Sequence, residues 1–140
     1  MALPQVHVNE CPLSSCVFTV AEAGELQDWH FDGNDFIVTL MLEDSPKGGH
    51  FEFATGLRRP NREDDFESIS QVIAGKYADV NRPDIRPGTL TLFKGKYSLH
   101  RASAVEGEGR RVMAVLSYET TPGRIGGNEY LKLFYGRGLV

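Results

Sequence analysis

The 140-residue sequence has few cysteines, no marked excess of one charge and no long apolar run. Two cysteines, Cys11 and Cys16, cannot make a disulfide framework, and their spacing is not that of a paired-cysteine metal site. No apolar stretch approaches the roughly 20 residues that cross a bilayer, and the first residues lack a basic-then-apolar signal. A net charge of −4 without a basic tract does not indicate nucleic acid or a membrane as a partner. A reduced, cytoplasmic protein is therefore expected.

Short apolar segments separated by turn residues recur along the chain. They are rich in Val, Ile, Phe, Thr and Tyr, the residues that suit half-buried strands. Their sequences are CVFTV, DFIVTLML, HFEFA, TLTLFKG and RVMAVLSY. The segments DSPKGG and NRPDIRPG carry turn chemistry, and VEGEGR predicts a tight hairpin tip. This pattern predicts one mainly β domain over residues 1–140, folded as a barrel or sandwich.

Two segments depart from the strand pattern. Residues 63–77 begin with acidic residues, place apolar residues at helical spacing and reach Gly75 near their end, which predicts a short amphipathic helix. The C-terminal segment GGNEYLKLFYGR predicts a second short helix around residues 129–134.

His30 and Asp32 form an HxD pair that can bind a metal. On an extended chain residues i and i+2 point to the same face, so the imidazole and the carboxylate are presented together. Two histidines and one carboxylate make the facial triad of non-haem Fe(II) oxygenases, which leaves other positions open. His100 is the best third ligand, because it follows a long strand that Pro87 and Gly88 open. An HxD pair alone is weak evidence, since a single histidine on a strand is more often structural or solvated.

A basic residue strengthens the metal interpretation. Arg111 lies eleven residues beyond His100 and opens the segment RVMAVLSY. It is expected on the neighbouring antiparallel strand, facing the same cavity. A guanidinium there suits bidentate pairing with a dicarboxylate. The adjacent Arg110 would face the other way.

The order of HxD, distal histidine and basic residue resembles the Fe(II)/2-oxoglutarate dioxygenases with a double-stranded β-helix fold. The stretches that carry the resemblance are WHFDGNDFIVTLML, PKGGHFEF and RPGTLTLFKGKYSLHRASAVEGEGRRVMAVLSY. The tail EYLKLFYGR is similar to that of a bacterial branch of hydroxylases and radical halogenases that act on free amino acids. The resemblance implies a mainly β jelly-roll, cupin-like barrel with one or two short helices.

The resemblance also implies a cofactor set and a role for each matching residue. The Fe(II) ligands of that family match His30, Asp32 and His100. Arg111 matches the residue that binds the distal carboxylate of 2-oxoglutarate, which together with O2 would be consumed in the reaction. A hydroxyl commonly assists that arginine, and Thr39 and Ser117 are the candidates.

The activity implied is hydroxylation of a small molecule, with a free amino acid as the leading substrate and with release of succinate and CO2. Halogenases of this kind replace the metal-binding carboxylate with Gly or Ala, whereas this sequence keeps Asp32. Hydroxylation is therefore expected, not halogenation. Related enzymes carry a helical N-terminal region before the barrel, and only 29 residues precede His30. A barrel that lacks this extension would leave a sheet uncovered, which favours a homodimer.

Several other residues have two interpretations each. Trp29 either lines the substrate pocket or belongs to the core, and Asp35 either faces a substrate amine or caps a turn. Arg101 either touches substrate or points outward. Glu52 either faces the cavity or lies on a solvated outer face, and the outer face is expected.

Two other functions fit a barrel of this kind. A cupin-type enzyme or metal-binding module typically carries HxH followed by a glutamate and a later histidine, and HFD lacks the second histidine. A degenerate, non-catalytic cupin-like barrel that acts as a binding subunit is the other alternative. The intact triad and Arg111 oppose it, and iron binding without turnover would support it.

Overall fold

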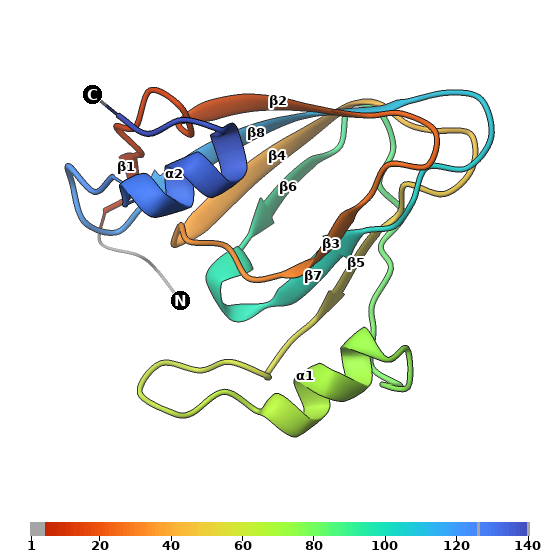
Figure 1. The fold of residues 1–140 in the computed structure, drawn as a ribbon, viewed down its shortest axis with the longest axis horizontal. Coiled ribbons are helices and arrows are strands. Elements are labelled where there is room, and N and C mark those ends of the chain that lie inside the picture. Colours follow the sequence, from red (N-terminus) through yellow and green to blue (C-terminus); the bar gives the residue numbers. More distant parts are fainter. Residues whose placement is uncertain (1–4, 126, 140) are drawn as a thin grey trace.

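The computed structural model describes residues 5–125 and 127–139 (Figure 1). Its strands are β1 (His7–Val8), β2 (Cys16–Ala21), β3 (Gln27–His30), β4 (Phe36–Glu43), β5 (Phe51–Ala54), β6 (Leu90–Phe93), β7 (Leu99–Ala102) and β8 (Arg111–Glu119). Its helices are α1 (Phe66–Ile73), the short 3₁₀ helix η1 (Gly95–Tyr97) and α2 (Asn128–Tyr135). The strands form two antiparallel sheets that face each other, which confirms the predicted mainly β jelly-roll fold. Among the described residues the sheets do not join into one closed hydrogen-bonded barrel.

The larger sheet has the strand order β1-β8-β4-β6, and β2 also pairs with β8. Side chains alternate between the two faces of a strand, so every second residue points to the inner side. Thr19 lies opposite Met113 and Thr39 opposite Val115, and all four face inward. The inner face of this sheet therefore forms one long wall of a cavity.

The smaller sheet has the order β3-β7-β5 and forms the opposite wall. Its register places His30 opposite His100, so both imidazoles lie side by side on the inner face. Its outer face packs on the chain around α1, which lies beneath this sheet in Figure 1. The buried members of that core cluster are Ala54, Leu57, Val72 and Leu99.

The long strand expected before His100 is two strands in different sheets. β6 belongs to the larger sheet, η1 interrupts the chain, and β7 belongs to the smaller sheet. The interruption falls where the Gly95 carbonyl accepts a hydrogen bond from the Asp32 N–H at 3.1 Å. The crossing between sheets is thus stabilised by a contact with a distant loop in addition to the local turn of η1.

The segment VEGEGR was predicted as a hairpin tip, and this prediction is wrong. β7 and β8 do not pair, so the segment connects the smaller sheet to the larger one. Arg111 consequently lies on the sheet opposite His100 and not on the neighbouring strand. It still faces the same cavity, because the two inner faces oppose each other.

Both predicted helices are present, and the first is shorter than expected. α1 begins after Asp65, whose side chain accepts a hydrogen bond from the Ser68 N–H at 3.0 Å. The preceding Asp64 pairs with Arg58 at 2.7 Å, outside the helix. This cap fixes the start of α1, because the capping residue itself is not helical.

The second helix, α2, ends at Gly136, which adopts the left-handed conformation that favours glycine (φ 69°). It adds three aromatic side chains to the lining of the cavity, those of Tyr130, Phe134 and Tyr135. No helix in the described part of the chain has the length and apolar character needed to span a bilayer.

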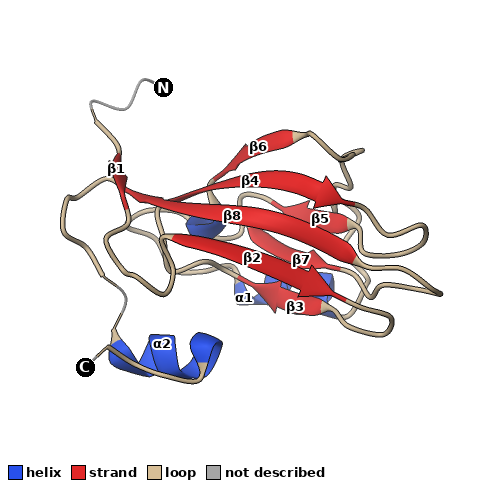
Figure 2. Ribbon diagram, turned by 90° about the horizontal axis from the view of Figure 1, so that it is seen from above, coloured by secondary structure: helices blue, strands red, loops and turns tan. Residues whose placement is uncertain are grey.

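The outer face of the larger sheet is apolar and exposed. The strand register places two rows of apolar residues on it, with Phe18, Ala114, Leu40 and Leu90 in one row and Cys16, Leu116, Val38 and Leu92 in the next. Leu92 is 69% exposed. In Figure 2 the larger sheet lies nearest the viewer, and no helix of the described chain crosses in front of it. An exposed apolar face of this extent indicates a contact surface, and the homodimer stays a prediction.

Replacing Val72 tests whether α1 is held by its buried side. Val72 is 1% exposed, whereas the adjacent Ile73 is 60% exposed. Val72→Ala removes buried methyl groups and leaves a cavity, so it should lower the free energy of unfolding by about 2 kcal/mol. Ile73→Ala is the matched control and should change it by less than about 0.5 kcal/mol. Urea unfolding followed by circular dichroism measures both, and equal losses would contradict this packing.

Candidate metal centre

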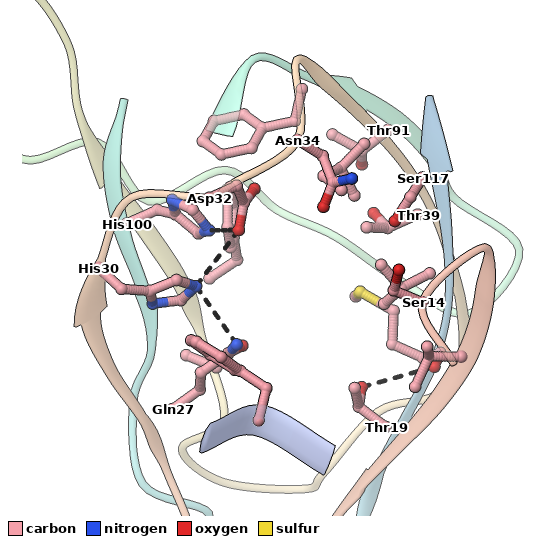
Figure 3. Close-up of a pocket in the computed structure, with 18 of the residues that line it drawn as sticks. Ser14, Thr19, Gln27, His30, Asp32, Asn34, Thr39, Thr91, His100 and Ser117 are labelled. Atoms are coloured by element: carbon pink, nitrogen blue, oxygen red, sulfur yellow. Dashed lines mark hydrogen bonds and ion pairs between the residues drawn. The ribbon is translucent and has the colours of Figure 1, made fainter. Parts of the chain in front are cut away.

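A cavity of about 350 Å³ lies between the two sheets (Figure 3). Its size is that of a small-molecule binding site. The larger sheet contributes hydroxyl and apolar side chains, and the smaller sheet contributes the two imidazoles and Phe51. The cavity is therefore apolar over much of its wall, with a few polar groups directed inward.

His30, Asp32 and His100 meet at one wall of this cavity, and together they are the group of described residues placed to hold a metal ion. The Nε2 atoms of His30 and His100 lie 3.6 and 3.5 Å from Oδ1 of Asp32. Metal bonds of about 2.1 Å at right angles place neighbouring ligand atoms about 3 Å apart. Small side-chain adjustments would therefore bring all three atoms to one ion. Figure 3 shows the three side chains on one side of the open cavity.

Backbone carbonyls set the tautomers of the two histidines. Nδ1 of His30 lies 2.6 Å from the Asp28 carbonyl oxygen, and Nδ1 of His100 lies 2.9 Å from that of Ser98. A carbonyl oxygen only accepts, so each Nδ1 carries a proton, and Nε2 is the nitrogen on the Asp32 side that can give up its proton to bind a metal. Metal-binding histidines are held in the same way.

Asp32 occupies a space that a glycine leaves free. A Cβ built on the buried Gly95 would overlap the Asp32 carboxylate. The next residue in η1, Lys96, binds Asp35 with its Nζ 2.8 Å from Oδ1. η1 thus holds the loop that carries the carboxylate ligand at two points. The sequence contained no signal for this contact beyond the glycine of KGK.

The charges of the triad depend on one another. Burial would raise the pKa of Asp32, but the hydrogen bonds and charges of His100 and His30 outweigh it and lower the pKa to about 2. Burial would lower the pKa of His30, but the neighbouring Asp32 and the Asp28 carbonyl outweigh it and raise the pKa above 6.5. The site thus attracts positive charge, and a bound cation would take the place of the proton on Nε2.

Arg111 places an unpaired guanidinium in the same cavity. Arg111 is 6% exposed. Among residues 5–125 and 127–139 its Nε has no hydrogen-bond partner, and its Nη2 reaches only the Met113 sulfur at 3.6 Å. Burial lowers the pKa of Arg111, and the charge of Asp44 opposes this effect. A buried cation without a partner is unfavourable, so its presence indicates that an anionic ligand completes it.

The hydroxyls predicted to assist Arg111 lie at different positions along the cavity. Ser117 is six residues further along β8, about 20 Å away along the strand, and lines the other end. Thr39 lies across from β8 four residues beyond Arg111. Thr19, which was not predicted from the sequence, lies opposite Met113 and is therefore nearer to Arg111 in register than Thr39 is. The roles of Thr39 and Ser117 stay predictions.

Trp29 and Arg101 are not among the residues that line the cavity. The Arg101 guanidinium lies 4.8 Å from the Trp29 ring centre, and its Nε donates to Glu52 Oε2 at 2.6 Å. Arg82 also pairs with Glu52, which is 3% exposed. The solvated position expected for Glu52 is therefore wrong, because two arginines distant in sequence cover it.

Asp35 is also buried outside the cavity lining. Burial would raise the pKa of Asp35, but hydrogen bonds from Lys96 and Thr120 outweigh it and hold the pKa well below its usual range. Its contacts fasten the loop after the metal ligands.

Several cavity residues were not identified from the sequence. Gln27 Nε2 lies 3.3 Å from His30 Nε2, the atom that would bind a metal. Tyr130 packs over Gly33, and burial raises the pKa of Tyr130 to about 12. Asn34 lines the cavity two residues after Asp32. The aromatic residues of the tail were the one signal available.

Two facing antiparallel sheets, with two histidines and a carboxylate that could hold a metal ion on their inner side, define a double-stranded β-helix protein. The chain belongs to the Halogenase D family, whose model matches residues 3–123.

A solved structure with a similar fold is that of an oxidoreductase of the 2OG-Fe(II) oxygenase family from Burkholderia pseudomallei. The TM-score is 0.54 and the sequence identity 16%, over 76% of this chain and 42% of that one. The chain thus spans less than half the length of that protein. No curated protein matches the sequence. The likeness to the solved structure confirms the predicted fold, and the branch of amino-acid hydroxylases stays a prediction.

Gly95→Ala should displace the Asp32 carboxylate and weaken binding of a divalent metal by about 10- to 100-fold. In an Asp32→Ala background the added methyl group meets no carboxylate, so the same substitution should cause little further loss. Titration with Co(II) compares the four proteins. Gly127→Ala is the control, because nothing lies within 4 Å of its Cβ position. Equal losses in both backgrounds would show that Gly95 acts on the fold and not on Asp32.

Metal affinity and metal-free stability should change with pH in opposite directions. Because the pKa of His30 is raised in the folded protein, the pairing of His30 with Asp32 stabilises the fold fully below pH 6.5. This stabilisation is lost as the pH rises through the pKa of folded His30. The contribution of ionised Asp32 to stability is fully present above pH 3.8 and is lost as the pH falls through about 2. Metal-free stability from this pair should therefore be highest between pH 3.8 and 6.5.

Co(II) affinity, in contrast, should rise as pH increases past 6.5, because His30 must lose a proton to bind the ion. Thermal denaturation and Co(II) titration across this range measure the two trends, with His30→Gln as the reference. A Co(II) affinity independent of pH would count against the proton on His30.

Proposed function

We propose that the protein is an Fe(II)- and 2-oxoglutarate-dependent oxygenase that hydroxylates a small molecule. The observation that carries the proposal is the unpaired guanidinium of Arg111, buried in the cavity that His30, Asp32 and His100 also line. A dicarboxylic acid that reaches a metal with one end and Arg111 with the other would complete both groups. 2-Oxoglutarate has that charge and is the cosubstrate that the family resemblance implies.

The donor set fits Fe(II). Two imidazole nitrogens and one carboxylate oxygen on one side of an ion are the ligands of non-haem Fe(II) oxygenases. The carbonyls behind His30 and His100 support this choice, because they hold each Nδ1–H and so leave Nε2 as the nitrogen that can bind the ion. When bound, the iron would supply the binding and activation of O2.

The chain itself would supply orientation and a dry cavity. The rings of Phe51 and Phe93 lie 5.8 and 4.8 Å from the His100 ring and shield it. Arg111 would fix the far carboxylate of 2-oxoglutarate and so limit the ways in which the molecule can lie. Exclusion of water strengthens the charge interactions and prevents side reactions.

Hydroxylation is proposed in preference to halogenation because Asp32 takes the third ligand position. Gly95 keeps the space for that carboxylate free. The products from 2-oxoglutarate would be succinate and CO2. A free amino acid is the substrate that the resemblance favours.

The first test is anaerobic addition of Fe(II) and 2-oxoglutarate, which should give a visible charge-transfer band. His100→Ala should abolish the band, because it removes an iron ligand. Arg111→Ala should keep it and require at least about tenfold more 2-oxoglutarate, because charge-assisted hydrogen bonds are lost. Arg110→Ala is the matched control and should behave as the wild type, since Arg110 is exposed and pairs with Glu43 at 2.9 Å.

A folded, iron-loaded wild type without the band would contradict the cosubstrate assignment. A band without succinate release on a panel of free amino acids and other small molecules would support the alternative, a non-catalytic metal-binding barrel that acts as a binding subunit.

A further inference from the structure

A buried carboxylate that the proposed chemistry does not use lies behind the cavity end away from Arg111, in contact with the lining residue Asn34. Glu119, at the end of β8, is 2% exposed. Its Oε2 accepts from the Asp35 N–H and from Arg124 Nη1, each at 3.4 Å. Its Oε1 accepts from the side-chain amides of Asn9 at 3.1 Å and Asn34 at 2.7 Å. Every one of these partners is a donor.

A backbone group fixes the direction of the hydrogen bonds to Oε1. Asn9 Oδ1 accepts from the Cys11 N–H at 2.9 Å, so the Asn9 amide nitrogen must face Glu119. Glu119 Oε1 is then an acceptor, and only the NH2 group of Asn34 can lie against it. The oxygen of Asn34 must face the other way, and Figure 3 shows it directed into the cavity.

Ser14 is oriented by the same group. Its hydroxyl lies 3.3 Å from Asn9 Oδ1, an atom that only accepts, so the hydroxyl hydrogen points to Asn9. The Ser14 oxygen keeps its lone pairs for the cavity, which it lines. Asn34 and Ser14 therefore both present acceptors to the cavity, and both orientations follow from the contacts of Glu119 and Asn9.

We infer that Glu119 makes this end of the cavity a binding site for a substrate group that carries N–H or O–H hydrogens. The inference rests on the proposed function and deepens it, because it names the chemistry of the substrate end. An amine, a primary amide or an alcohol fits the two acceptors. An ester, an ether or a carboxylate would face lone pairs and be rejected. Asn34 and Ser14 would contact the substrate, and Glu119 is a positioning residue.

Benzamide and N,N-dimethylbenzamide make a suitable probe pair, because they share the ring and the carbonyl and differ in their N–H groups. Ligand-observed NMR titration of the metal-free protein gives a Kd for each. Both probes offer the same ring and the same carbonyl, so the ratio of the two values reports the N–H contacts. The wild type should bind benzamide roughly five- to tenfold more tightly.

Glu119→Gln preserves size and replaces one carboxylate oxygen with an NH2 group. The Asp35 N–H and Arg124 both donate to the Oε2 side and cannot accept, so the remaining oxygen should lie there. The NH2 group should then face Asn34, whose amide turns to present its oxygen. The binding ratio should then fall to about one. Glu129→Gln makes the same chemical change on a side chain that is 90% exposed, and it should keep the wild-type ratio. Asn34→Leu removes the acceptor without touching Glu119, and it should also abolish the preference if Glu119→Gln does not fold.

A second measurement determines the orientation of the Asn34 side-chain amide directly. In the wild type, nuclear Overhauser contacts should join the Asn34 side-chain NH2 protons to those of Asn9, since both groups bind Glu119 Oε1. The inference would be overturned if the wild type bound both probes equally or bound neither. It would also be overturned by an unchanged ratio in folded Glu119→Gln, or by an Asn34 NH2 group that faces the cavity. A missing charge-transfer band would reject the proposed function alone, because neither measurement uses iron or 2-oxoglutarate.

Discussion

Two of the segments that cross between the sheets meet beside the candidate metal site, and their contact is the constraint on which the structure depends. Residues 31–35 carry the chain from β3 to β4, and η1 carries it from β6 to β7. They meet where the Asp32 N–H binds the Gly95 carbonyl and where Lys96 binds Asp35. The first crossing carries the carboxylate ligand, and the second leads directly to His100. The sheet arrangement and the geometry of the three ligands are therefore set by the same hydrogen bonds.

The cavity formed around this contact differs in character from end to end. Arg111 supplies positive charge at one end, and Asp32 supplies negative charge at the triad. Beyond it lie the acceptors that Glu119 orients. Because β8 runs from Arg111 to Glu119, a single strand fixes the distance between the anion-binding end and the donor-binding end. Cosubstrate and substrate would thus be sorted by opposite hydrogen-bonding character, without a separate domain for each.

The sequence identified the candidate metal ligands, but it did not predict how the chain brings them together. HFD and His100 were identifiable because few residue types serve as metal ligands. Arg111 was expected beside His100, yet it faces the cavity from the opposite sheet, since local turn residues cannot distinguish a hairpin from a crossing. The burial of Glu52 was missed because its arginine partners lie far away in the sequence. The pairing of Asn9 with Glu119, 110 positions apart, is likewise a product of the fold that one sequence does not encode locally.

The place of β6 at the edge of the larger sheet links the metal site to local unfolding. β6 pairs with β4, and its other edge meets no strand of the described chain. Edge strands open more readily than central ones. Gly95 follows β6 almost directly, so opening this edge would release the contact that holds Asp32. Thermodynamic linkage requires the reverse as well: an ion that fixes the carboxylate also stabilises the outermost strand. Metal occupancy would then slow amide hydrogen exchange in residues 90–93, in a different sheet from both histidines.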